Sequence, residues 1–136
     1  MKTITGKASI DQIPVFTGFV DQELEACGCP IKQQMQIDVV LDELLSNIAL
    51  YAYPAGPGEV TLSFEFDAGS RTAVLQFSDG GIPYNPTEMP DPDVSLPAEK
   101  REIGGLGIFI VRKTMDEMRY SRENGKNILT VKKAIR

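Results

Sequence analysis

Apolar residues along the chain recur with two different periods, and each period predicts a different element. From residue 59 to 67 the apolar residues alternate with polar ones, which is typical of a strand with one buried face. From residue 37 to 48 apolar side chains instead recur at helical spacing, which predicts an amphipathic helix. The strand positions are Val60, Leu62, Phe64 and Phe66, and the helix positions are Ile37, Leu41, Leu44 and Ile48.

Helix and turn signals set the limits of the remaining elements. Ser9 and Gln12 match the S-x-x-Q capping box, so the first helix is expected to begin there, and Gly28 is expected to cap its end. Asn124-Gly125 is a strong hairpin signal. The expected strands are residues 2–8, 59–67, 71–78, 118–123 and 127–134, and the expected helices are 9–28, 30–51 and 104–117. The expected apolar face of the third helix is Ile108, Val111, Met115 and Met118.

This order of elements predicts a single domain, residues 1–136, of the α+β class. We expect a two-layer sandwich, in which a mixed, mostly antiparallel sheet carries three helices on one face. Residues 80–103 are rich in proline and have no consistent period. Segments of that length inside a compact domain are usually functional or disordered.

Charge and composition narrow the range of partners. The chain has 14 basic and 19 acidic residues and a net charge of −5, which disfavours nucleic acid and anionic membrane surfaces as main partners. No stretch approaches the roughly 18 apolar residues of a membrane span, and no signal peptide is apparent. Cys27 and Cys29 are too close for a disulfide to be expected, and no histidine can complete a metal site with them. We therefore expect free thiols in a reducing cytoplasm.

Glu43 and Asn47 are the first candidate site residues. Their i, i+4 spacing places them on one side of the second predicted helix, beside its apolar stripe. Carboxylate and carboxamide oxygens suit Mg²⁺, which usually keeps several waters and takes one or two protein ligands. Taken alone, the pair fits a solvated helix face better than a metal site.

Asp79 is the second candidate, because it ends a predicted strand and is followed by Gly80 and Gly81. A carboxylate in this place can accept a hydrogen bond from an exocyclic amine such as that of adenine, and glycines let a ligand approach the backbone. Taken alone, Asp-Gly is more typical of a tight turn.

The third candidate is the run Gly104-Gly105-Leu106-Gly107 at the start of the third predicted helix. Backbone amides at a helix start, free of Cβ crowding, form an anion site. No Gly-Lys-Ser/Thr follows, so the run is not a Walker motif and alone would indicate only a flexible loop.

Together, in this order and spacing, the three motifs resemble the N, G1 and G2 boxes of the GHKL (histidine-kinase-like) ATPase domain. The runs Asp79–Pro86 and Gly104–Val111 are most similar to the RsbW-like branch of anti-sigma-factor serine/threonine kinases. The resemblance covers essentially the whole chain and implies the histidine-kinase-like (Bergerat) fold.

The resemblance also implies roles for individual residues. Asn47 would help to hold the Mg²⁺ that bridges the ATP phosphates. Asp79 would accept a hydrogen bond from the adenine amino group, and Gly81 would line the adenine pocket. Glu43 would act as a base toward a serine or threonine hydroxyl of a protein, although related ATPases use a glutamate there to activate water.

The phosphates are expected at the start of the third helix, beside Gly105 and Gly107 within the run Gly104–Gly107. Residues 87–103 would form a lid over ATP. Lys100 and Arg101, near the end of that segment, are placed to meet phosphate charge, an inference from their position and not from the family.

Two departures from the family pattern bear on the assignment. Pro83 replaces the last glycine of the G1 box, a variant familiar in the anti-sigma branch, and stiffens the start of the lid. Tyr51 stands where many relatives carry a histidine, and the chain has no histidine to serve as phosphoacceptor.

The resemblance leaves several functions open. One is a kinase that phosphorylates a STAS-type anti-anti-sigma protein, also binds a sigma factor and switches partners with nucleotide state. A second is a nucleotide-dependent interaction module without phosphotransfer, and a third is an ATPase or kinase in another regulatory switch. The family implies a homodimer through the N-terminal strand and first helix, but Phe16 and Phe19 fit the core better than an interface.

Overall fold

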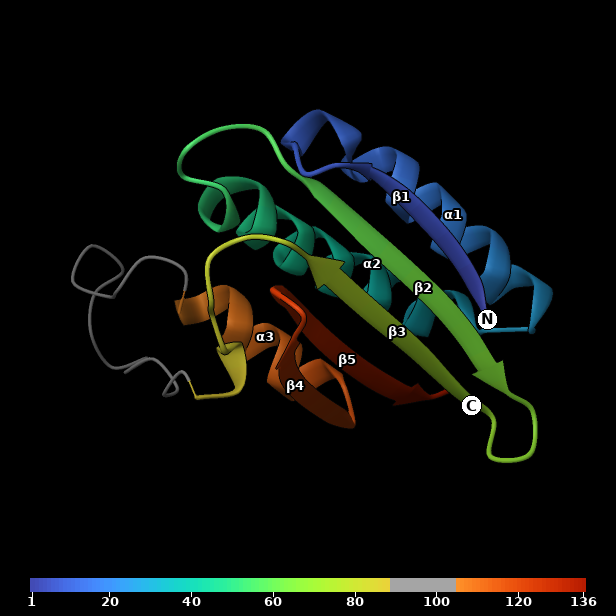
Figure 1. The fold of residues 1–136 in the computed structure, drawn as a ribbon. Coiled ribbons are helices and arrows are strands. Elements are labelled where there is room, and N and C mark those ends of the chain that lie inside the picture. Colours follow the sequence, from blue (N-terminus) through green and yellow to red (C-terminus); the bar gives the residue numbers. More distant parts are fainter. Residues whose placement is uncertain (89–104) are drawn as a thin grey trace.

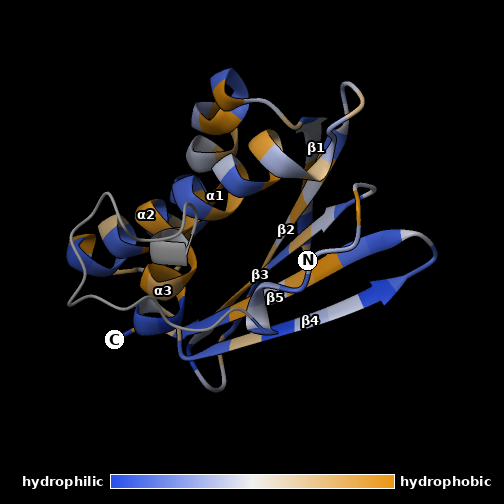
Figure 2. Ribbon diagram, turned by 90° about the vertical axis from the view of Figure 1, so that its left-hand side faces the viewer, coloured by the Kyte–Doolittle hydropathy of each residue, from blue (hydrophilic) through white to orange (hydrophobic). Residues whose placement is uncertain are grey.

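The protein forms two layers, with an antiparallel sheet in one and helices packed on a single face of it in the other (Figures 1 and 2). The computed structural model describes residues 1–88 and 105–136, and residues 105 and 106 in backbone only. The helices are α1 (Ile13–Ala26), α2 (Ile31–Asn47) and α3 (Gly105–Thr114). The strands are β1 (Lys2–Lys7), β2 (Glu59–Asp67), β3 (Thr72–Asp79), β4 (Glu117–Glu123) and β5 (Lys126–Ala134).

The strands are arranged in the order β1-β2-β3-β5-β4, and each neighbouring pair is antiparallel. The α+β class and the helices on one face are therefore confirmed. The expected mixed sheet is corrected to an antiparallel one within the described residues. The β2–β3 and β4–β5 pairs are hairpins, and β5 returns beside β3 in the opposite direction, so no parallel pair arises.

The core lies between the sheet and the helices, and strand alternation supplies its sheet side. On β3 the inward positions are Ala73, Leu75 and Phe77, and the same alternation makes Asp79 the next inward position. The helices contribute the expected stripes, since Phe16, Val20, Leu24, Ile37, Leu41 and Leu44 are buried. Phe19 and Ile48 are partly buried against this core. The inward face of β3 is therefore apolar until it reaches a carboxylate at its end.

The expected capping box at the first helix is wrong. Residues Ile10–Gln12 form a short 3₁₀ turn, and α1 begins only at Ile13 with Pro14 in its first turn. The Ser9 hydroxyl donates to Oδ1 of Asp11 at 2.6 Å and caps no backbone amide. A nearby carboxylate is a strong acceptor, so it diverts the hydroxyl from the role that the capping box requires. Gly28 adopts φ +77° after α1, as its predicted capping role requires.

The third helix is shorter than expected. It ends at Thr114, because the next residues join the sheet: the Asp116 N–H donates to the Lys132 carbonyl at 2.8 Å. The Asp116 carboxylate also accepts a bond from the Ala134 N–H at 2.7 Å. Met118 therefore lies on β4, where it packs against the core, and does not belong to the apolar face of α3.

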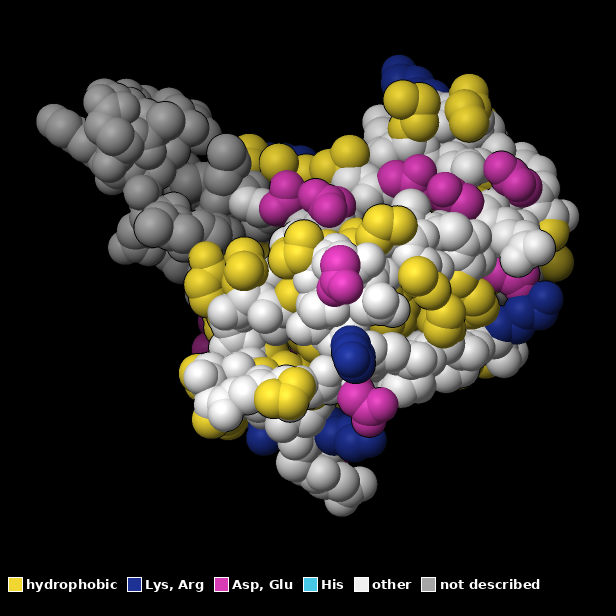
Figure 3. Space-filling model, turned by 90° about the horizontal axis from the view of Figure 1, so that it is seen from above, with side chains coloured by type: hydrophobic (Ala, Val, Ile, Leu, Met, Phe, Trp, Pro, Cys, Tyr) yellow, Lys and Arg dark blue, Asp and Glu magenta, His cyan; other side chains and the backbone are white. Residues whose placement is uncertain are grey.

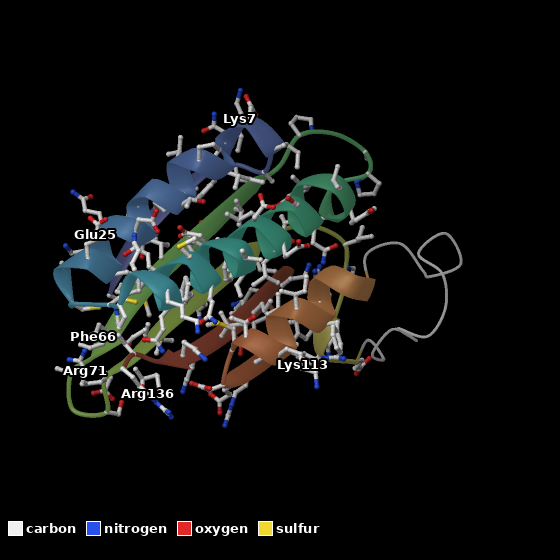
Figure 4. The ribbon with its side chains drawn as sticks, turned by 180° about the vertical axis from the view of Figure 1, so that it is seen from behind. Lys7, Glu25, Phe66, Arg71, Lys113 and Arg136 are labelled. Atoms are coloured by element: carbon white, nitrogen blue, oxygen red, sulfur yellow. The ribbon has the colours of Figure 1, made fainter. Side chains whose placement is uncertain are left out.

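The β4–β5 hairpin has the turn that its Asn-Gly pair predicts, and side-chain contacts of Arg71 stabilise the β2–β3 hairpin. Asn124 and Gly125 have φ of 53° and 77°, which is the left-handed backbone of a two-residue type I′ turn. At the β2–β3 turn the Arg71 guanidinium lies 5.6 Å from the centre of the Phe66 ring, and its Nε donates to the Ile135 carbonyl (Figure 4). Arg71 thus ties the C-terminal end of the chain to this hairpin.

Acidic side chains are scattered among apolar ones on the face seen in Figure 3, in keeping with the net charge of −5. Among the described residues, none of the helices has the length and apolar character needed to traverse a bilayer.

Candidate nucleotide site

The candidate site lies at one end of the sheet, where the last turns of α2, the end of β3 and the start of α3 come together (Figure 1). A pocket there has a cavity volume of about 80 Å³ and is open to solvent on one side. Asn47 from α2 and Asp79 from β3 both line it. Most of its other walls are apolar or aromatic, including Leu44, Ile48, Tyr51, Phe77, Ile82, Tyr84, Tyr120 and Leu129. A concave apolar site with a few convergent polar groups is the usual form of a small-molecule pocket.

Asp79 is the buried polar group at the sheet side of this pocket, with 6% of its surface exposed. Its Oδ1 accepts hydrogen bonds from the Gly81 N–H at 2.9 Å and from Nδ2 of Asn127 at 3.0 Å. Among the described residues no hydrogen bond ends on Oδ2. One carboxylate oxygen is thus held by the protein, and the other remains an acceptor for a bound molecule.

Asn47 lies at the end of α2, where the helix continues into a π-helical turn at Ile48–Ala52. Its side chain is half-buried in the pocket wall and makes no hydrogen bond to any described residue. The wider π turn carries the chain toward the end of β3, because the Ala52 carbonyl accepts a bond from the Ile82 N–H at 2.9 Å. The Asn47 carboxamide oxygen is therefore available to a ligand or metal.

Glu43 lies one turn before Asn47 and is half-buried against the first turn of α3. A Cβ added to Gly107 would overlap its Oε2 and lie 3.3 Å from its Cδ, so the glycine leaves room for the Glu43 carboxylate in this position. No described residue donates a hydrogen bond to the carboxylate. The structure therefore places Glu43 of α2 beside the glycine run at the start of α3, and neither Glu43 nor Gly107 is among the residues that line the pocket.

Gly81 is needed for a second close approach, at the turn after β3. A Cβ at this position would lie 2.6 Å from that of Ala52 and would overlap the Ala52 carbonyl. The Gly81 carbonyl accepts a bond of 2.8 Å from the Arg122 guanidinium. Gly81 thus allows the turn to rest on the π-helical segment, and it is not among the residues that line the pocket.

Tyr53 fixes the same turn from the other side. Its hydroxyl donates to the Glu59 carbonyl at 2.5 Å and accepts the Gly80 N–H at 2.7 Å. Burial is the largest cause that raises the pKa of this phenol, and the Asp79 charge adds to it. The neutral hydroxyl can therefore donate and accept at once throughout the physiological range. No motif in the sequence identified Tyr53 as a site residue.

No motif identified Asn127 either, although it is a polar residue at an inward position of the strand pattern. It shares the inward face of β5 with Leu129 and Val131, and it is paired in register with Asp79. Asparagine is depleted in strands, so an asparagine at a buried alternation position calls for a specific partner. That partner is the Asp79 carboxylate.

Several predicted site residues lie outside what the structure describes. Lys100, Arg101 and Gly104 fall among residues 89–104, as does most of the expected lid. Gly105 and Leu106 form the start of α3, with only their backbone described. Their expected contacts with phosphate remain predictions. Among the described residues no cluster of three acidic, cysteine or histidine side chains could hold a metal alone.

Comparison with known proteins identifies a family and several relatives. The family model of the histidine kinase-like ATPase domain matches residues 7–133. The serine/threonine-protein kinase BtrW of Bordetella bronchiseptica is 31% identical over 91 residues, which cover 66% of this chain and 63% of the relative. The serine-protein kinase RsbW of Bacillus mycoides is 24% identical over 98 residues, covering 69% and 60%. The matches thus span less than two thirds of the length of these relatives.

Solved structures agree at the level of the fold. The blue-light activated histidine kinase of Erythrobacter litoralis EL346 superposes with a TM-score of 0.56 and 18% identity, over 79% of this chain and 32% of that one. The Acinetobacter baumannii histidine kinase AdeS gives a TM-score of 0.53 and 15% identity, over 99% and 69%. With the family model matching nearly the whole chain, this protein belongs to the histidine kinase-like ATPase domain family.

Proposed function

We propose that the chain binds ATP with Mg²⁺ in this pocket and transfers the terminal phosphoryl group to a serine or threonine of a protein partner. The observation that supports this most is the presence of Asp79 and Asn47 in the wall of one pocket, on different elements. Oδ2 of Asp79 is an acceptor suited to the adenine amino group. The apolar and aromatic walls suit the purine ring.

The residues present fit a magnesium ion that also binds the nucleotide. Mg²⁺ usually keeps several waters and takes one or two protein oxygens together with substrate phosphates. The carboxamide oxygen of Asn47, which no described residue engages, would supply one such ligand, so a cluster of acidic ligands is not required. Bound there, the ion would neutralise phosphate charge.

Glu43 is the proposed base toward the acceptor hydroxyl. It lies one helical turn from Asn47 and faces Gly107, at the helix start where the phosphates are expected. Phosphoryl transfer needs mainly positioning and electrostatic stabilisation, and a positioned base adds about 10²- to 10⁴-fold in rate. The Glu43 carboxylate would accept the hydroxyl proton as the serine or threonine oxygen bonds to the γ-phosphorus and the bond to ADP breaks.

The proposed acceptor is a STAS-type anti-anti-sigma protein in the cytoplasm, with a sigma factor as a second partner exchanged according to nucleotide state. Support comes from the relatives, which are named serine or serine/threonine-protein kinases, and from the resemblance of the two glycine motifs to the anti-sigma branch.

Phosphotransfer from labelled Mg-ATP to purified STAS proteins of the source organism tests this function. We expect phosphoserine or phosphothreonine on one of them. Glu43→Gln should lower the rate about 10²-fold or more while leaving ATP affinity within about threefold. Asp42→Asn, at the neighbouring exposed carboxylate of α2, is the matched control and should transfer normally. ATP binding without transfer to any STAS protein would contradict the kinase function and favour an interaction module.

A further inference from the structure

Asn127 occupies a position from which it can control Asp79. It is the second residue of β5, directly opposite Asp79 on β3, and only 6% of its surface is exposed. Every hydrogen-bonding group of its side chain is engaged. Nδ2 donates to Oδ1 of Asp79 at 3.0 Å and to the Ile82 carbonyl at 2.8 Å. Oδ1 accepts the Tyr120 hydroxyl at 2.5 Å and the Tyr84 N–H at 3.3 Å.

Two backbone groups fix which way this carboxamide points. The Ile82 carbonyl can only accept, and the Tyr84 N–H can only donate. A carboxamide turned by 180° would set its oxygen against the Ile82 carbonyl and against Oδ1 of Asp79, and its NH₂ against the Tyr84 N–H. The observed orientation is therefore the one that the backbone permits, and it presents a donor to Asp79.

The two carboxylate oxygens of Asp79 therefore have different roles. Oδ1 is occupied by the Asn127 and Gly81 donors, so rotation of the carboxylate would break two bonds. Oδ2 has no partner among the described residues and belongs to a side chain that lines the pocket. Because all four hydrogen-bonding positions of Asn127 are filled, it acts on a bound nucleotide through Asp79.

We propose that Asn127 is the positioning residue that makes the pocket selective for 6-aminopurines over 6-oxopurines. The inference rests on the proposed ATP binding. A 6-amino group donates to the fixed Oδ2 of Asp79, whereas a 6-oxo group presents an acceptor to the same oxygen. Selectivity then requires that the carboxylate cannot turn away, and the Asn127 donor holds it in place together with the Gly81 N–H.

The test compares the Kd of ATP with that of inosine triphosphate, which differs from ATP at the 6-position, by titration calorimetry. The wild-type protein should bind ATP about 10- to 100-fold more tightly, since a hydrogen bond to a charged group carries that selectivity. Asn127→Leu has nearly the same shape and removes the donor without adding a second carboxylate, and should bring the ratio of the two Kd values to within about threefold of one. Asn127→Ala, which also removes the donor, should have the same effect and replaces Asn127→Leu if that variant does not fold.

Thr130→Val is the matched control, because it removes a hydrogen bond between the same two strands, from Gln76 Nε2 to the Thr130 hydroxyl at 3.3 Å. Its Kd ratio should equal that of the wild type. A ratio that stays at about tenfold or more in the folded Asn127→Leu or Asn127→Ala protein would overturn the inference, as would a wild-type protein that binds ATP and inosine triphosphate equally. Failure of the wild type to bind ATP would instead overturn the proposed function.

Discussion

Asp38 on α2 makes the stability of the protein depend on pH. It faces Asp21 on α1, and one oxygen of each carboxyl group is buried without a hydrogen-bond partner in the described structure. Two ionised carboxylates have no donor between them, whereas a proton on Asp38 supplies one. Burial first, then the hydrogen bond and charge of Asp21, raise the pKa of Asp38 from 3.8 to about 7.

The direction of the pH effect on stability follows from proton binding in the native and the unfolded protein. The native protein keeps the Asp38 proton up to about pH 7, whereas the unfolded chain releases it near pH 3.8. The stabilising contribution is therefore complete below pH 3.8 and is lost as the pH rises to about 7. The full difference corresponds to about 4 kcal/mol. Because the carboxyl is partly open to solvent, screening reduces this to roughly 1–2 kcal/mol.

Asp38→Asn keeps a donor toward Asp21 and removes the titration. Urea unfolding at pH 8 should show this variant to be more stable than the wild type by roughly 1–2 kcal/mol, and the gap should narrow toward pH 5. Asp42→Asn, an exposed carboxylate further along α2, should stay within about 0.5 kcal/mol of the wild type. Parallel stability profiles for Asp38→Asn and wild type between pH 5 and pH 8 would refute the reasoning.

Further substitutions test the contacts around the pocket. Gly81→Ala places a Cβ against Ala52 and should cost about 1–3 kcal/mol in urea unfolding and weaken ATP binding about tenfold or more. Gly18→Ala, where nothing lies within 4 Å of the added atom, should instead stabilise α1 by about 0.5–1 kcal/mol. Tyr53→Phe leaves the Gly80 N–H without its acceptor and should cost about 1–3 kcal/mol, and unchanged stability would contradict its role at this turn.

Elements with a clear period were predictable from the sequence, because burial of one face alone determines them. The strand at 59–67 and the helix beginning after Pro30 have the expected inward residues. Helix ends that depend on a competition between two interactions were not predictable from the sequence. The Ser9 hydroxyl can bond to a backbone amide or to the Asp11 carboxylate, and it bonds to the carboxylate. The end of α3 is set where Asp116 joins β5, a strand that begins ten residues later in the chain.

In the candidate site, too, residues in local motifs were predictable, whereas residues that act through tertiary contacts were not. Glu43, Asn47 and Asp79 belong to local motifs, and their types and spacing were enough to propose a shared site. Tyr53 and Asn127 act on Asp79 and its turn through contacts that arise only when α2, β3 and β5 are assembled. For Asn127 the sequence shows a polar residue at an inward strand position, but not the carboxylate opposite it.

The measurement that tests the central claim most directly is titration of the protein with ATP in the presence and absence of Mg²⁺, alongside the Asp79→Asn variant. The account predicts saturable binding of one ATP, tighter with Mg²⁺, and an affinity at least about tenfold weaker when Asp79 is replaced. Absence of ATP binding by the folded wild-type protein, or equal affinity in the folded variant, would contradict it.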